Sequence, residues 1–148
     1  MSINNEHFLQ KHRLFRECLE VLNVSMIPET ESELIGNVFE NTFPITTWGK
    51  IDWEKIDHKI EIDYDPKDIV PSLEKLFGRK VNTEVYILWS SARYPVIKAN
   101  LHDIVQHFDD VTCVSFEKFI FNFELLYILE ILSSDKMTIG VLPERVRK

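Results

Sequence analysis

The residues best suited to chemistry lie in one acidic stretch, Ile51–Asp68, with the sequence IDWEKIDHKIEIDYDPKD. Seven of its eighteen residues are carboxylates and three are lysines, which leaves a local charge of −4. Carboxylates at this density can bind a metal ion, act as general acid and base, or attract a basic partner. They are Asp52, Glu54, Asp57, Glu61, Asp63, Asp65 and Asp68.

The spacing Asp63-x-Asp65-x-x-Asp68 superficially resembles a calcium loop. Such a loop also needs further oxygen ligands, a glycine at its turn and a late bidentate glutamate, and none of these follows. Asp65 precedes Pro66 and Asp68 begins a helical pattern, so both suit turn and cap positions. We therefore expect no metal site. A carboxylate pair of the glycosidase type stays open, because it depends on a separation in space.

Other residue types give no catalytic motif. His102 and His107 are five apart, which is a poor spacing for two ligands on one helix. Ser90 follows a strong strand pattern, but its context LWSSARY lacks the small residues of a nucleophile elbow. The chain has four glycines and neither a GxGxxG nor a P-loop pattern. We expect no catalytic residue and no cofactor.

The composition is that of a soluble globular protein with one domain, 1–148. The net charge of −7 disfavours binding to nucleic acid or to an anionic membrane, and it suits a basic partner. Cys18 and Cys113 belong to no CxxC pair, so a disulfide framework is not expected. The N-terminal sequence MSINNEHFLQKHRLFRE carries charges where a secretory signal needs an apolar run, which predicts a cytoplasmic protein.

Apolar periodicity predicts an N-terminal helical segment, 1–43, and a mixed sheet region, 44–142. The expected helices are Asn5–Leu22, Glu29–Phe43, a short helix that begins at Pro66 or Asp68 and is stopped by Gly78, and Leu101–Phe108, the last ended by Asp109 and Asp110. Between Ile45 and Asp65 we expect two strands, with the turn between them at Trp48-Gly49 or at Glu54–Asp57. The other expected strands are Val81–Ser90, Val111–Phe116, Lys118–Phe123, Leu125–Leu132 and Lys136–Leu142. This order indicates an α+β fold: a mainly antiparallel sheet with helices packed on one face, in a single domain.

The C-terminal half contains VYILWSS, then YPVIKANLHDIVQHF, DDVTCVSFEKFIFN and LYILEILSSDKMTIG. Over Trp48–Gly140 the chain resembles bacterial immunity proteins of contact-dependent growth inhibition and related polymorphic toxin systems. The resemblance implies a small cytosolic protein, not an enzyme, that binds the C-terminal domain of a cognate toxin and blocks it. Many such toxins are nucleases with basic clefts. An acidic surface can fill such a cleft by imitating the phosphate backbone of DNA or RNA.

With that resemblance, we interpret the acidic stretch as a strand pair or loop whose exposed face meets a basic toxin domain. Trp53 is expected to supply an apolar anchor, and Ile60, Ile62 and Tyr64 are expected to point inward. Asp109 and Asp110 form a second acidic pair. The candidate partner-binding residues are Asp52, Trp53, Glu54, Asp57, Glu61, Asp63, Asp65, Asp109 and Asp110.

Three other interpretations remain open. The chain could be a small enzyme or ligand-binding domain with a pocket near Ser90, Arg93 and His102. It could be an interaction domain in which Trp48 and Tyr94 form a homodimer contact. The acidic stretch could also be no more than the solvated face of a strand.

Overall fold

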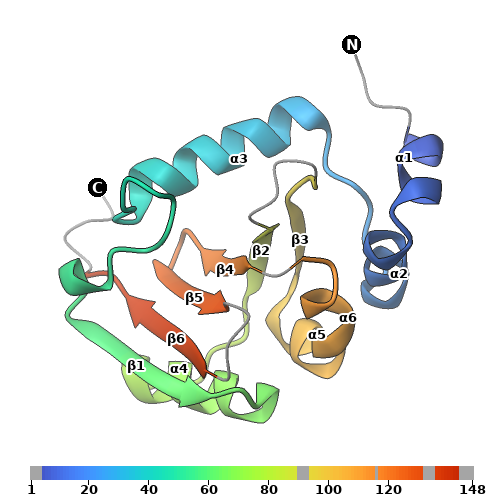
Figure 1. The fold of residues 1–148 in the computed structure, drawn as a ribbon. Helices are drawn as coiled ribbons and strands as arrows, with labels where there is room; N and C mark the ends of the chain where they lie inside the picture. The colour runs from blue at the N-terminus through green and yellow to red at the C-terminus, as the bar shows by residue number, and fades with distance from the viewer. Residues whose placement is uncertain (1–4, 90–93, 116, 132–135, 144–148) are drawn as a thin grey trace.

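The computed structural model describes residues 5–89, 94–115, 117–131 and 136–143. Its centre is a six-stranded sheet in the order β1-β6-β5-β4-β2-β3, with every neighbouring pair antiparallel (Figure 1). The predicted α+β class with an antiparallel sheet in a single domain is confirmed. The strands are β1 (His58–Asp63), β2 (Glu84–Trp89), β3 (Ile97–Asn100), β4 (Lys118–Asn122), β5 (Tyr127–Ile131) and β6 (Lys136–Val141).

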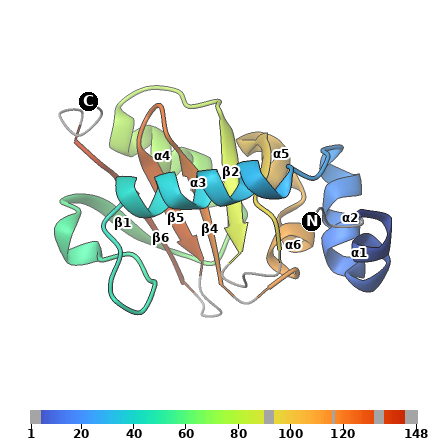
Figure 2. The same ribbon diagram turned by 90° about the horizontal axis from the view of Figure 1, so that it is seen from above.

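Helices surround this sheet, and α3 crosses one face of it (Figure 2). The α-helices are α1 (Asn5–Lys11), α2 (Arg13–Leu22), α3 (Glu29–Thr42), α4 (Ile69–Phe77), α5 (Leu101–Gln106) and α6 (Phe108–Thr112). Two short 3-10 helices, η1 (Trp53–Lys55) and η2 (Pro66–Asp68), flank β1. Every helix among the described residues is too short or too polar to cross a lipid bilayer.

The helices divide between the two faces of the sheet, whereas the sequence led us to expect them on one face. Phe39 of α3 packs with Phe119 and Phe121 of β4, while Ile120 between them belongs to the core on the opposite face. That opposite core also takes apolar residues of α2, α4, α5 and α6. The reason lies in β4 and β5, whose residues are all buried. Strands covered on both sides need a layer of structure over each face.

Two expected boundaries near the helices are wrong. The described part of the expected strand, 111–115, is not a strand, and Phe116 lies outside the described residues. Val111 and Thr112 end α6, and Phe108 and Val111 face the core one helical turn apart. Asp109 and Asp110 do not break a helix, because they lie in the first turn of α6, where acidic side chains suit the helix dipole. The break falls instead at His107. The β-branched residues that favoured a strand here are outweighed by tertiary packing.

Of the two strands expected between Ile45 and Asp65, the second is present as β1. The first is reduced to one isolated bridge, Ile45 with Ile51, and Trp53 starts η1. The structure adds an unexpected short edge strand, β3, directly after the buried Pro95 and Val96. The expected helix Asn5–Leu22 is divided at His12, which has φ −121° and ψ 71°.

Tyr127 gives the fold a measurable sensitivity to alkali. Its ring is fully buried and its hydroxyl lies 2.6 Å from the Thr83 hydroxyl. Burial raises the pKa of Tyr127 to about 12, and the hydrogen bond with Thr83 opposes that rise. A raised pKa means that the folded chain holds this proton more tightly than the unfolded chain. The resulting stability is present below pH 10 and is lost as the pH rises toward 12.

We predict that the free energy of unfolding falls by about 2 kcal/mol through Tyr127 alone between pH 9 and pH 12. Urea unfolding at several pH values, compared between wild type and Tyr127→Phe, measures this contribution. The variant should lose less stability over the same range. Equal losses in the two proteins would contradict the assignment, because other alkaline groups such as Cys18 titrate in both.

Candidate functional site

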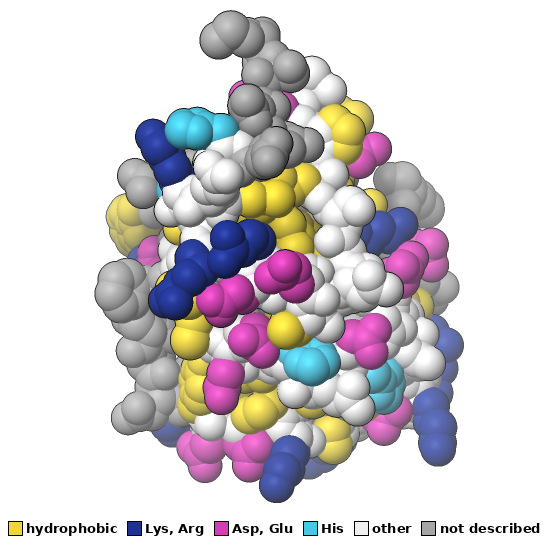
Figure 3. Space-filling view, turned by 90° about the vertical axis from the view of Figure 1, so that its right-hand side faces the viewer, with side chains coloured by type: hydrophobic (Ala, Val, Ile, Leu, Met, Phe, Trp, Pro, Cys, Tyr) yellow, Lys and Arg dark blue, Asp and Glu magenta, His cyan; other side chains and the backbone are white. Residues whose placement is uncertain are grey.

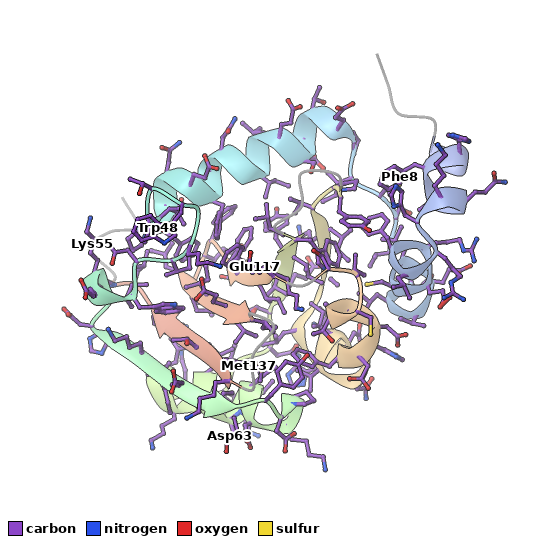
Figure 4. The ribbon with its side chains drawn as sticks, viewed as in Figure 1. Phe8, Trp48, Lys55, Asp63, Glu117 and Met137 are labelled. Carbon is purple, nitrogen blue, oxygen red and sulfur yellow. The ribbon has the colours of Figure 1, made fainter. Side chains whose placement is uncertain are left out.

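The acidic stretch follows one edge of the sheet, because β1 is the outermost strand beside β6. Figure 4 places Lys55 and Asp63 at opposite ends of β1. A strand of six residues is roughly 17 Å from end to end, so one small contact cannot include both ends. The predicted residues therefore separate into a first acidic group (Asp52, Trp53, Glu54 and Asp57) and a second acidic group (Glu61, Asp63, Asp65, Asp109 and Asp110).

In the first acidic group, Glu54 and Asp57 are exposed and Asp52 is half-buried. The Asp52 carboxylate lies 3.8 Å from the Lys55 ammonium, and the Asp52 amide donates to the Pro44 carbonyl at 2.8 Å. Asp52 is thus partly neutralised and has a role in holding the backbone. Glu54 and Asp57 are the members of this group whose carboxylates face solvent.

Trp53 is half-buried and is fastened to the sheet. Its indole N–H donates to the Glu130 carboxylate at 2.8 Å. Its ring packs over Gly140, where a Cβ atom would lie 2.6 Å from the Trp53 Cζ3 atom. Only the exposed part of the Trp53 ring can therefore serve as the expected apolar anchor for a partner. The more exposed indole is that of Trp48, whose exposed fraction is 76%.

Glu130 is the residue that positions this segment, and sequence reasoning missed it. It lies on β5 with 6% of its surface exposed. One carboxylate oxygen accepts the Trp53 indole N–H and the other accepts the Ile51 amide N–H at 3.1 Å. A signal was present in the sequence: Glu130 is the only charge in the run LLYILEIL, and a buried charge needs partners.

The second acidic group is assembled by an aromatic contact. Tyr64, next to the end of β1, packs against Phe108 at the start of α6 with a distance of 5.6 Å between ring centroids. This contact brings the chain around Asp63 and Asp65 beside the chain of Asp109 and Asp110. Two acidic segments that are far apart in the sequence thus share one region.

Several carboxylates of this second group have close local partners. Glu61 lies 3.5 Å from Lys136, and Asp110 lies 3.9 Å from the His107 ring. The Asp65 carboxylate accepts the Lys67 amide and begins η2, as a turn residue should. Ile60 and Ile62 pack against the core as expected, while Tyr64 keeps 37% of its surface exposed.

Basic side chains also lie near the second group. Figure 3 looks onto the side of the molecule that carries α1 and α2, and acidic and basic side chains lie next to one another there. On α2, Arg13 pairs with Glu17 at 3.6 Å and Arg16 with Glu20 at 3.9 Å. This side therefore mixes both signs of charge.

The buried ammonium of Lys118 has a structural position. It donates to the carbonyls of Thr112 and Ser115, at 3.1 and 2.9 Å, just after the end of α6. Burial lowers the pKa of Lys118, and the neighbouring Cys113 and Glu117 oppose that change. Lys118 thus ties the end of α6 to the start of β4 through these two carbonyls.

The alternative pocket near Ser90, Arg93 and His102 is only partly visible, because Ser90 and Arg93 lie outside the described residues. His102 is exposed, with its ring 3.3 Å from the Val81 carbonyl. Tyr94, the expected dimer contact, is half-buried against Phe15 at 5.4 Å between ring centroids. Among the described residues, no three His, Cys, Asp or Glu side chains gather in a way that could hold a metal ion.

We predict that Glu130→Leu loosens the segment that carries the first acidic group, because two donors lose their acceptor. The cost should be on the order of 2–4 kcal/mol in the free energy of unfolding. Glu130→Gln, which keeps one acceptor oxygen, should cost less. Urea unfolding gives the stabilities, and hydrogen exchange at the Ile51 amide reports the segment itself. Unchanged exchange at Ile51 in Glu130→Leu would contradict this role.

No curated protein matches the chain. A family model described as "CdiI immunity protein EcoliA0-like" matches residues 12–140. The match covers most of the chain, including nearly all of the elements that support the two acidic groups. This match confirms the resemblance seen in the sequence over Trp48–Gly140. The chain therefore belongs to the EcoliA0-like family of CdiI immunity proteins.

Proposed function

We propose that this protein binds the C-terminal domain of a cognate polymorphic toxin in the cytoplasm and neutralises it by forming a tight complex. Membership of an immunity protein family is the observation that carries the proposal. The toxin domain is a nuclease with a basic active-site cleft. The protein acts as an inhibitor and not as an enzyme, so its surface has to match the toxin and no reaction has to be catalysed.

Charge supports this choice of partner. The chain has a net charge of −7, and exposed carboxylates lie along the edge strand β1 and on α6. Complementary charge speeds the encounter of two proteins and favours the correct orientation. The proposed partner-binding residues are Asp52, Trp53, Glu54, Asp57, Glu61, Asp63, Asp65, Asp109 and Asp110.

The first acidic group is the better candidate for direct contact. It follows Trp48 in the chain by only a few residues, so exposed carboxylates and an exposed indole lie on one segment. Aromatic side chains supply most of the binding energy in many interfaces, while surrounding charges set the rate of association. The second acidic group then adds to the attraction at a distance.

Co-expression tests the function itself. The C-terminal toxin domain encoded directly upstream is produced with and without this protein. We expect growth inhibition by the toxin domain alone, and both protection and a co-purifying complex when this protein is present. Toxicity that persists in the presence of this protein would overturn the proposal.

We predict that Glu54→Lys with Asp57→Lys weakens the complex by about tenfold or more, through slower association and faster dissociation. Both side chains are exposed, so folding should be unaffected. Surface plasmon resonance with a catalytically inactive toxin domain gives the two rate constants.

Asp63→Lys with Asp109→Lys is the matched control, because it changes the net charge equally and also uses exposed positions. This control should slow association and leave dissociation nearly unchanged. Faster dissociation in the control alone would move the direct contact to the second acidic group. Unchanged binding in both double variants would rule out the acidic edge as the toxin-binding surface.

A further inference from the structure

A cavity of about 360 Å³ opens beneath α3, beside the loop that precedes the first acidic group. Its apolar lining comes from Phe39 of α3, Ile45, Leu88 of β2 and Phe119 of β4. Its polar lining is Glu40, Lys50 and Glu117. Trp48 and Glu117 both lie on the side of the sheet that faces α3 (Figure 4). The cavity thus combines an apolar floor with charged groups at its rim.

Trp48 stands at the rim of this cavity in a fixed turn. The Thr46 amide donates to the Lys50 carbonyl at 2.7 Å, and the Gly49 amide donates to the Thr46 carbonyl at 3.1 Å. Gly49 has φ +83°, a conformation that favours glycine. The turn therefore holds a 76% exposed indole out of the core. Exposing so much apolar surface on an ordered turn costs stability unless a partner covers it.

Gly36 forms part of the α3 wall, and the fold gives it no packing reason to be glycine. A Cβ atom at this position would meet only the Leu88 Cδ1 atom, at 4.0 Å. Glycine inside a helix costs about 1 kcal/mol relative to alanine. The missing side chain leaves space at the cavity, which suits the close approach of a group from outside.

The charge around the cavity selects a cation. The helix α3 has four glutamates and no lysine or arginine. Glu33 and Glu40 lie three residues before and four residues after Gly36, so they share its side of the helix. Lys50 is the cation at the rim, and its ammonium is paired with the Glu117 carboxylate. The uncompensated charge beside the cavity is negative.

The geometry points to a binding site for one lysine or arginine side chain of the basic toxin domain. The aliphatic stem lies on the apolar floor, the cationic head reaches Glu40, and the Trp48 ring contacts the cation through its face. This inference rests on the proposed function and names the part of the surface where the toxin is anchored. It adds Gly36, Glu40 and Trp48 to the contact residues, which only the folded chain brings together.

Filling the cavity from Gly36 tests the inference. A Cβ atom at position 36 meets no neighbouring backbone atom and leucine favours the helix, so Gly36→Leu should fill the space in a protein that remains folded. Titration calorimetry with the inactivated upstream toxin domain should show binding weakened by about tenfold or more. Trp48→Ala removes the exposed indole and should weaken binding to a similar extent.

Two matched variants act as controls. Gly36→Ala adds only a methyl group, so it should stabilise α3 and weaken binding less than Gly36→Leu, because it fills less of the cavity. Leu34→Ala shortens another exposed apolar side chain of α3, 62% exposed and outside the cavity lining, and should also leave affinity nearly unchanged.

The outcomes separate the two proposals. Wild-type affinity in both Gly36→Leu and Trp48→Ala, together with continued protection from the toxin, would overturn the cavity and leave the immunity function standing. A wild-type protein that neither binds nor protects against the upstream toxin domain would overturn the immunity function and this inference with it. Weakened binding in the two cavity variants alone supports the site.

Discussion

The Glu130 carboxylate fastens the acidic segment to the sheet, and the arrangement of the candidate surface depends on it. Both of its oxygens accept hydrogen bonds from this segment, one from a backbone amide and one from the Trp53 indole. A buried carboxylate is costly to desolvate, and charged hydrogen bonds are the compensation that makes it tolerable. The segment between α3 and β1 thereby becomes a fixed part of the molecule, although it contains little regular secondary structure.

The two-sided sheet explains why such an interaction is needed. The strands β4 and β5 are covered on both faces, by α3 on one side and by the larger group of helices on the other. The acidic segment completes the α3 side through Ile51 and Ile56, which belong to the same core. Its charged residues remain outside, on a backbone that the core holds in place. A rigid surface of this kind loses little conformational entropy when a partner binds.

Much of the sheet could be predicted from the sequence, because its β-branched and aromatic runs are local signals. The helix stops at Asn23 and Gly78 could be predicted as well, and both residues have positive φ. The failures have a tertiary origin. Val111 has strand propensity but lies in a helix that packs on the core. Phe119 and Ile120 alternate between two cores, and this pattern does not tell which helix covers which face of the sheet. Similarly, the sequence could identify the acidic residues before, within and after β1 but not that this strand separates them into two groups.

Gly140 and Trp53 are linked by a steric constraint that extends to the evolution of this chain. The indole lies so close to the Gly140 backbone that a Cβ atom there has no room while Trp53 is in place. A larger residue at position 140 requires a smaller one at position 53, or a displaced acidic segment. The two positions therefore cannot drift independently. A lineage that changes its surface to follow a changing toxin can vary the exposed carboxylates one at a time, whereas this pair has to change together.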